Sequence, residues 1–291
     1  MTLFCLGSIN LDHFYEVPQI PQPGETLLAK AHRTGLGGKG ANQSVAAAQA
    51  GADVVHIGAV GADGAWAKAR MTQLGVNTAY VSEVAAPTAH ALITVDAAGE
   101  NAIVVFPGAN MHQSLTQLKT ALLTAKRGDM LLLQNETNLA LEAATLAGSL
   151  GLTVLYAAAP FEAAATKALL PLTNLLILNA VEMAQLTEAT GLSPESLAPE
   201  TIIITEGSKG GRAITQAGET RFPAFPVKAR DTTGAGDTFT GYLAAALLEG
   251  QPLESALRLA AAASALKVTK KGTADAIPAR AEVEAFLKAQ P

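Results

Sequence analysis

The sequence Asp231-Thr-Thr-Gly-Ala-Gly-Asp237-Thr-Phe239 places two carboxylates around a loop of small residues, directly before an apolar run at 242–248. This pattern predicts that Gly234 to Asp237 lie at or just before the N-terminus of a helix. Backbone N–H groups at such an end have no helical acceptor and the helix dipole is positive, so the loop suits an anion such as phosphate. Asp237 then has two alternative roles: it caps the helix, or it takes a proton from a nucleophile beside the phosphate.

Apolar runs alternate with helical patterns on both sides of this loop. The runs expected to be strands lie at 3–7, 54–60, 130–134, 153–156, 175–178 and 201–205. Continuous apolar strands are typical of a parallel sheet covered on both faces, so we predict a doubly wound α/β fold with flanking helices. No internal repeat or low-complexity linker divides the sequence, and one domain over 1–291 is expected.

Two segments interrupt the alternation of strands and helices, at about 12–35 and 87–107. The first contains a short predicted strand at Thr26–His32, and the second a predicted hairpin of Thr88–Val95 and Asn101–Phe106. Together they predict one small β layer that projects from the main domain. This layer is either a lid over a ligand site or a pair of static surface hairpins.

Polar side chains follow two of the predicted strands, at the sheet edge where open α/β folds bind ligands. Asn10 and Asp12 are two residues apart, so both can face one side of an extended segment and offer an amide and a carboxylate to a polyol. An ordinary turn is the alternative for this pair. Glu136 follows the strand at 130–134 at the same edge.

The loop Gly35-Leu-Gly-Gly-Lys-Gly-Ala-Asn42 precedes an alanine-rich helical segment that extends to about Ala50. Its glycines allow positive φ angles and close approach of the backbone to a ligand. Lys39 adds a point charge, and Asn42 adds an amide on the first helical turn. A ligand-binding loop is therefore favoured over a purely structural turn, although the GxxxxGK[ST] spacing of a Walker A loop is absent.

Asn179 and Glu182 are spaced to share one face of the first turn of a helix after the strand at 175–178. Two oxygen-bearing side chains in this arrangement suit either helix capping or the water molecules of Mg²⁺, which loses its waters reluctantly. A second glycine-containing loop, Glu206-Gly-Ser-Lys-Gly-Gly211, follows another predicted strand.

The composition limits the classes of partner. The formal net charge is −5 with a pI near 5.6, so nucleic acid and anionic membranes are not expected as partners. No apolar run approaches the ~18 residues of a membrane span, and no basic segment precedes the first strand. The single Cys5 excludes an intramolecular disulfide. These features predict a cytoplasmic protein.

Several segments, taken together and in order, resemble the ribokinase-like (PfkB-type) sugar kinases. The two signature segments are Gly37-Gly-Lys-Gly-Ala-Asn-Gln43 and Asp231-Thr-Thr-Gly-Ala-Gly-Asp237. The others are Gly7-Ser-Ile-Asn-Leu-Asp12, Pro23-Gly-Glu-Thr26, Pro107-Gly-Ala-Asn110, Leu133-Gln-Asn-Glu136, Asn179-Ala-Val-Glu182 and Val268-Thr-Lys-Lys-Gly272. The resemblance covers essentially the whole chain. It implies a doubly wound α/β fold with a β lid, and transfer of the ATP γ-phosphoryl group to a sugar hydroxyl.

The resemblance also implies roles for individual residues. Asp237 matches the catalytic base, and Gly234, Ala235 and Gly236 match the anion hole whose N–H groups stabilise the transferred phosphoryl group. The sugar-binding positions correspond to Asn10, Asp12, Gly38, Lys39, Asn42 and Glu136. The nucleotide and magnesium positions correspond to Asn179, Glu182 (which holds Mg²⁺ through water), Thr205, Gly207 and Gly210.

Asp231 matches the carboxylate of a monovalent-cation site, usually for K⁺, completed by backbone carbonyls near Thr233, Lys267 and Gly272. Ala276 stands about where the ribokinase type carries a hydroxyl ligand for that ion, so the match to the K⁺ site is incomplete. A departure also occurs in the adenine pocket, where Ala261 replaces an expected larger residue. Lids in this family often pair between subunits, so a homodimer through the β layer is expected.

Ribose, phosphorylated at its 5-hydroxyl, is the predicted substrate, because Asn10, Asp12, Glu136 and the glycine-rich loop favour it over fructose. Deoxyribose and nucleosides such as adenosine or pseudouridine are the alternatives, since His13-Phe14-Tyr15 offers an aromatic lid surface. A non-catalytic sugar-binding regulator on the same fold is the alternative from another class. The intact loop around Asp237 argues against that reading.

Overall fold

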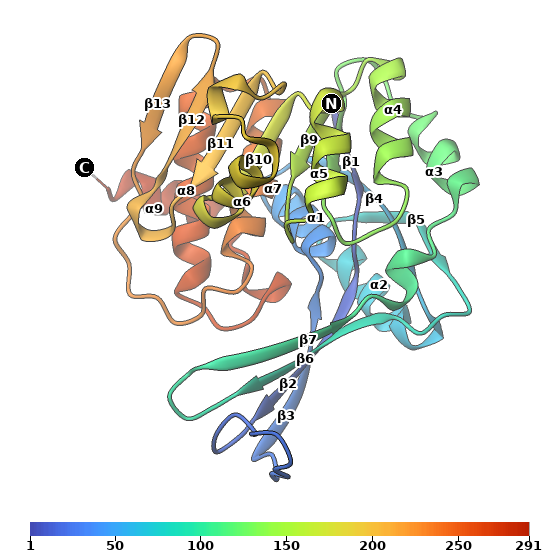
Figure 1. The fold of residues 1–291 in the computed structure, drawn as a ribbon, viewed down its shortest axis with the longest axis vertical. Coiled ribbons are helices and arrows are strands. Elements are labelled where there is room, and N and C mark those ends of the chain that lie inside the picture. The colour runs from blue at the N-terminus through green and yellow to red at the C-terminus, as the bar shows by residue number, and fades with distance from the viewer. Residues whose placement is uncertain (291) are drawn as a thin grey trace.

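The structure is a computed structural model that describes residues 1–290, and it is organised around a nine-stranded sheet (Figure 1). The strand order is β13-β12-β11-β10-β9-β8-β1-β4-β5, and every neighbouring pair from β11 to β5 is parallel. The predicted doubly wound α/β fold is confirmed. The strands are β1 (Thr2–Leu6), β4 (Asp53–Val60), β5 (Asn77–Glu83), β8 (Met130–Leu133), β9 (Thr153–Ala157), β10 (Leu175–Asn179), β11 (Thr201–Thr205), β12 (Gly211–Thr215) and β13 (Gly218–Phe222).

Helices cover both faces of the large sheet. They are α1 (Lys39–Gln49), α2 (Ala65–Gln73), α3 (Leu115–Leu122), α4 (Ala140–Leu150), α5 (Ala163–Leu169), α6 (Ala180–Thr190), α7 (Ala235–Leu248), α8 (Leu253–Val268) and α9 (Arg280–Lys288). Successive strand side chains point to opposite faces, so β1 sends Leu3 and Cys5 into the core under α1, α7 and α8. Phe4 and Leu6 enter the core under α3 to α6. Within residues 1–290, no helix combines the length and apolarity that crossing a membrane requires.

A separate sheet in the order β3-β2-β6-β7 projects from the main body (Figure 1). Its strands are β2 (Asn10–Glu16), β3 (Ala31–Gly37), β6 (Ala89–Val95) and β7 (Asn101–Phe106). The predicted β6–β7 hairpin is confirmed, but the strand predicted at Thr26–His32 is wrong, because β2 pairs with β3 only as far as Glu16↔Ala31. The residues from Thr26 to Lys30 are exposed apart from the half-buried Leu27, and they form a loop before Ala31.

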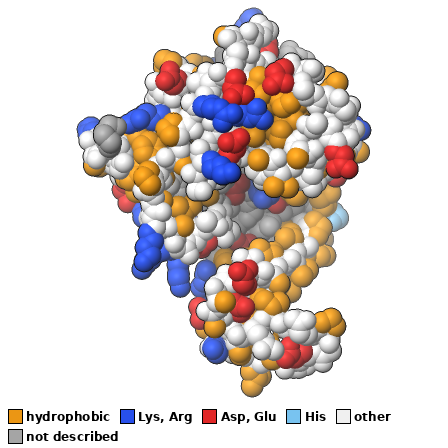
Figure 2. Space-filling model, turned by 60° about the vertical axis from the view of Figure 1, so that its left-hand side comes forward, with side chains coloured by type: hydrophobic (Ala, Val, Ile, Leu, Met, Phe, Trp, Pro, Cys, Tyr) orange, Lys and Arg blue, Asp and Glu red, His pale blue; other side chains and the backbone are white. Residues whose placement is uncertain are grey.

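The two faces of this small sheet differ in exposure. Along β2, Asn10, Asp12 and Phe14 are buried on one face, whereas His13 and Tyr15 are half-buried on the other. Figure 2 shows a hollow between the projecting sheet and the main body. Phe14 lines a cavity of about 660 Å³ there, opposite residues 229–233 of the main body. The inner face of β2 therefore carries predicted sugar-binding side chains toward the body.

The antiparallel pair β12–β13 ends the large sheet and was not among the predicted strands. Four of the five residues of β13 are exposed and only Phe222 is buried, so its sequence lacks the continuous apolar run of the interior strands. Edge strands with one wet face carry little hydrophobic pattern, which explains the omission.

Candidate active site

The glycine-rich loop joins α7 where the sequence predicts. Gly234 precedes the first helical residue with a φ of 74°, a left-handed conformation that suits glycine, and Asp237 lies in the first turn. Within the described residues, the backbone N–H of Gly236 has no acceptor, whereas the N–H of Ala235 donates to the Thr232 carbonyl at 3.2 Å. The loop thus presents unpaired N–H donors at the positive end of α7.

The Asp237 carboxylate does not cap α7, because its oxygens are held by side chains of α1. Asn42 Nδ2 donates to Asp237 Oδ2 and Gln43 Nε2 donates to Asp237 Oδ1, both at 3.0 Å. Gln134 Nε2 in turn donates to Gln43 Oε1 at 2.7 Å, which orients the Gln43 amide. The Asn42 Oδ1 atom is buried and has no partner within residues 1–290. A carboxylate fixed in this way has a defined direction toward a neighbouring hydroxyl.

Glu136 connects the end of β8 to the glycine-rich loop before α1. Its Oε2 accepts hydrogen bonds from Ser8 Oγ at 2.5 Å and from the Lys39 backbone N–H at 3.0 Å. Burial raises the pKa of Glu136, although the nearby Lys39 ammonium opposes that effect. Burial alone would lower the pKa of Lys39, but carboxylates including Asp237 and Glu136 outweigh it and raise that pKa. Carboxylates outnumber cations here, so the site favours a ligand that donates hydrogen bonds.

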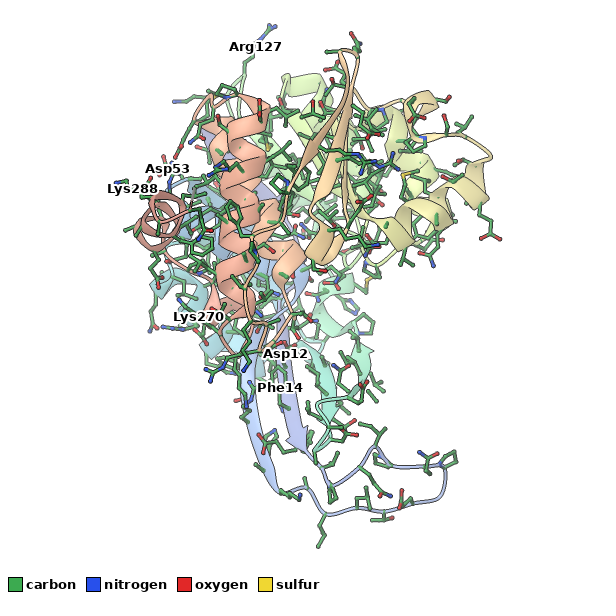
Figure 3. The ribbon with its side chains drawn as sticks, turned by 90° about the vertical axis from the view of Figure 1, so that its left-hand side faces the viewer. Asp12, Phe14, Asp53, Arg127, Lys270 and Lys288 are labelled. Atoms are coloured by element: carbon green, nitrogen blue, oxygen red, sulfur yellow. The ribbon has the colours of Figure 1, made fainter. Side chains whose placement is uncertain are left out.

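Asn10 and Asp12 extend this polar cluster along β2. Asn110 Nδ2 donates to Asn10 Oδ1 at 2.8 Å, and the Asn110 Oδ1 accepts from the Ile9 N–H at 3.0 Å. Asp12 and Phe14 point from β2 beneath the main body (Figure 3). The Asp12 carboxyl lies against Gly37, where a Cβ atom would come within 2.1 Å of Oδ2. Burial, reinforced by the Glu136 charge, raises the pKa of Asp12 to about 7.

A second hollow adjoins this cluster on the other side of the glycine-rich loop. Thr205, Gly207, Gly210 and Ala261 line a cavity of about 530 Å³ whose wall is mainly apolar. A smaller cavity of about 180 Å³ is lined by residues that include Lys39, Asn179, Glu182 and Asp237. The two cavities share Thr205, Thr232, Ala235 and Gly236 in their walls. Asp237 and the free N–H groups of α7 therefore lie where the polar cluster meets the larger cavity.

The model of the pfkB family carbohydrate kinases matches residues 2–280. The chain belongs to the PfkB family of carbohydrate kinases. This PfkB kinase is 38% identical to the ribokinase of Haemophilus influenzae, over 99% of this chain and 98% of the relative. It is 32% identical to the deoxyribokinase of Salmonella typhi, over 99% of both chains. The Arabidopsis thaliana ribokinase structure complexed with ribose and ATP superposes with a TM-score of 0.86, at 30% identity over 99% of both chains.

Asn179 and Glu182 of the PfkB kinase form a reciprocal capping box at the start of α6. Asn179 Oδ1 accepts from the Glu182 N–H at 2.9 Å, and Glu182 Oε2 accepts from the Asn179 N–H at 2.8 Å. The capping alternative therefore holds, yet the Glu182 carboxylate still faces the small cavity. Within residues 1–290, no group of three or more His, Cys, Asp or Glu side chains is arranged to hold a metal. The residues present fit a hydrated Mg²⁺ that arrives with a nucleotide, rather than a fully protein-bound ion.

The groups predicted to bind K⁺ in the PfkB kinase accept hydrogen bonds from the protein itself. The expected carbonyl ligand of Lys267 accepts the Lys270 N–H at 3.0 Å, and the Lys267 side chain itself points to Asp231. Both Asp231 carboxylate oxygens accept backbone N–H groups, from Thr233 at 3.0 Å and from Gly272 at 2.9 Å. With the Lys267 ammonium in place, these residues do not fit a bound monovalent ion.

Four residues of the PfkB kinase site were not predicted from the sequence. Ser8, Gln43, Asn110 and Gln134 fix the predicted residues by hydrogen bonds, although none was assigned a role. Each lies inside a segment that carries the family resemblance, so its position was visible in the sequence. Which polar atoms meet depends on side-chain directions, which spacing alone does not supply.

Asp12→Asn should weaken ribose binding most at alkaline pH. The Asp12 carboxyl, with a pKa of about 7, gains its charge as pH rises from about 6 to 8, so the KM of the wild-type enzyme for ribose should fall over that range. The variant should show a flat profile in the same assay.

Although Asp12→Asn should weaken ribose binding, it should stabilise the folded protein at alkaline pH. The folded protein holds the Asp12 proton more tightly than the unfolded chain does, so its stability decreases as pH rises from about 4 to 7. The variant avoids this loss and should melt at a higher temperature at pH 8 than the wild type. A variant with both lower affinity and a lower melting temperature would contradict this account.

Proposed function

We propose that this PfkB kinase transfers the γ-phosphoryl group of ATP to the 5-hydroxyl of ribose. The observation that carries the proposal is the position of Asp237, which two amides hold at the junction of the polar cluster and the nucleotide-sized cavity. The similarity to ribokinases over the whole chain supports ribose as the acceptor.

The Asp237 carboxylate accepts the proton of the 5-hydroxyl as the hydroxyl oxygen forms its bond to the γ-phosphorus. The bond from the γ-phosphorus to the bridging oxygen breaks at the same stage, and ADP leaves. The N–H groups of Gly234 and Gly236 at the start of α7, with the Lys39 ammonium, stabilise the negative charge of the transferred group. Positioning and electrostatics supply most of the rate enhancement in this chemistry.

The polar cluster supplies the recognition of the sugar hydroxyls. Asp12 and Glu136 accept hydrogen bonds, Asn10 contributes an amide, and the unpaired Asn42 Oδ1 accepts one more. The Gly38 backbone approaches this cluster with a φ of 90°. A site built to pair several hydroxyls discriminates strongly against an analogue that lacks one of them.

ATP occupies the cavity bounded by Thr205, Gly207 and Gly210, with its phosphates directed toward Gly236. The small side chain of Ala261 leaves room for the adenine ring on this wall. Glu182 would hold the waters of a nucleotide-bound Mg²⁺, which would supply positive charge beside the phosphates. The unpaired, buried Cys5 and the enzymatic role fit a cytoplasmic location.

Ribose should give the highest kcat/KM in a coupled assay of ADP release across ribose, deoxyribose, fructose, adenosine and pseudouridine. Loss of the 2-hydroxyl leaves a buried carboxylate or amide unpaired, at a cost of about 1–3 kcal/mol, so the kcat/KM for deoxyribose should be about 5- to 150-fold below that for ribose. Deoxyribose is the second candidate because a deoxyribokinase is among the relatives. Absence of turnover with any pentose would refute the assignment, and sugar binding without ADP release would indicate a regulator.

The small sheet is proposed as a lid that also joins two copies of the chain. Its outer face carries a stack of Tyr15 on His32, with ring centroids 4.6 Å apart, beside exposed Leu92, Val104 and Phe106. Hydrophobic side chains are visible along the projecting sheet in Figure 2. Pairing of two such faces buries this surface. Sedimentation analysis should find a dimer, and Val104→Glu should shift it to monomer.

A further inference from the structure

The side chain of Lys267 is fully buried, which is unusual for a lysine. It lies in the last turn of α8, its exposed fraction is 0%, and its Nζ donates to the Asp231 carbonyl oxygen at 3.0 Å. The Asp231 Oδ1 lies 4.0 Å from the same Nζ. A buried ammonium requires oxygen partners, and within residues 1–290 those of Lys267 come from Asp231 alone.

The Lys267 ammonium occupies the surroundings in which the family resemblance places a monovalent cation. The Asp231 carboxylate, the expected anchor of that ion, already accepts two backbone N–H groups. Ala276, at the position of the expected hydroxyl ligand, is buried and offers no oxygen from its side chain. A second positive charge beside the ammonium would repel it, and burial strengthens that repulsion because little water screens it. Lys267 therefore competes directly with a bound ion.

We propose that the Lys267 ammonium permanently replaces the monovalent cation, so that this kinase requires no K⁺. The inference rests on the proposed kinase function. It concerns the positioning of the catalytic loop and not the chemistry at the reacting atoms.

The connection from Lys267 to the active site is short. The Asp231 carbonyl that accepts its hydrogen bond is three residues before Gly234, at the entry to α7. The N–H groups of Arg230 and Asp231 both donate to the Val268 carbonyl, at 2.7 and 3.1 Å, and bind the same loop to the end of α8. Lys267 is thus a positioning residue, which holds the segment that carries the anion-binding N–H groups and Asp237. A tethered ammonium performs this role without any dependence on salt composition.

The first test measures turnover and melting temperature of the wild-type enzyme in tetramethylammonium, Na⁺ and K⁺ chloride at one ionic strength. Both quantities should be the same in the three salts, to within about twofold in kcat, because no site gains a ligand. A K⁺-specific activation of about tenfold, or a K⁺-specific rise in melting temperature, would overturn the proposal.

Two variants sharpen the test. Lys267→Ala removes the ammonium and opens its space, so kcat should fall about tenfold or more in tetramethylammonium and recover in K⁺, with a K⁺-specific rise in melting temperature. Lys267→Met fills the space without charge, so its activity should be low in all three salts. Rescue of Lys267→Met by K⁺, or unchanged activity of Lys267→Ala without K⁺, would contradict the role of the ammonium.

Lys270→Ala is the matched control, since Lys270 pairs with Glu282 at 2.9 Å on the surface and should behave as the wild type in every salt. If Lys267→Ala fails to fold, the wild-type salt response and Lys267→Met still decide the matter. The melting experiments need no substrate. An enzyme inactive on every sugar would therefore refute the proposed function and leave the cation experiment valid.

Discussion

Asp237→Asn should lower kcat for ribose phosphorylation by about 10²–10⁴-fold, because an amide cannot accept the proton of the attacking hydroxyl. The KM values for ribose and ATP should stay within a few-fold of the wild type, since the side-chain volume is nearly unchanged. One of the two amide donors that hold the side chain, from Asn42 or Gln43, would then face an NH₂ group. Steady-state kinetics with isothermal titration of ribose binding separate the chemical step from binding.

The matched control for this variant is Asp53→Asn, which makes the same change at an exposed position at the start of β4. That variant should keep normal kinetics. Near-normal turnover by Asp237→Asn would transfer the role of base to another carboxylate of the cluster, with Glu136 and Asp12 the candidates. An equal loss in both variants would point to a general effect on folding.

Gly40→Ala should strongly destabilise the protein, although it adds only one methyl group. The new Cβ would lie 2.4 Å from both the Gly7 Cα and the Ser8 backbone N, and neither atom belongs to a flexible side chain. Overpacking against backbone costs about 1–3 kcal/mol, and more where neither element can shift. Urea unfolding should therefore show a large fall in the free energy of unfolding, and the loss of the Gly40–Ser8 contact should also disturb Glu136.

Gly148→Ala is the control for that measurement, because a Cβ at Gly148 in α4 would have no heavy atom within 4 Å. It should raise the free energy of unfolding by about 0.5–1 kcal/mol, since alanine loses less conformational entropy in a helix. If both substitutions changed stability by similar amounts, close packing of α1 on β1 would not be the cause.

The interior of the fold was predictable because each interior strand is a continuous apolar run. The runs at 130–134 and 175–178 correspond to β8 and β10, with buried residues throughout most of their length. Where strands are mostly exposed, as in β13 and β3, the hydrophobic pattern is too weak to locate them. Tertiary pairing, and not local sequence, sets the bounds of these strands.

The candidate site was predictable as a set of positions but not as a set of contacts. The strand pattern placed Asp12 and Glu136 at one sheet edge, and only the resemblance to a family joined Asp237 to them. Spacing gave no sign that Gln43 would hold the base. The family resemblance implied only a backbone carbonyl at Lys267, and its side chain had no predicted role. Its buried ammonium could be recognised only from the packing of α8 against the loop before α7.

The direct passage of the chain from β1 into β2 has a consequence for communication between subunits. Only residues 7–9 separate the last residue of β1 from Asn10, so the strand that carries predicted sugar-binding side chains on one face carries the proposed subunit contact on the other. A partner that restrains β2 from outside would also restrain Asn10 and Asp12 inside. Thermodynamic reciprocity then requires ribose to strengthen dimerisation by the same factor by which dimerisation strengthens ribose binding. Through β2, ribose binding and dimerisation would thus each stabilise the other.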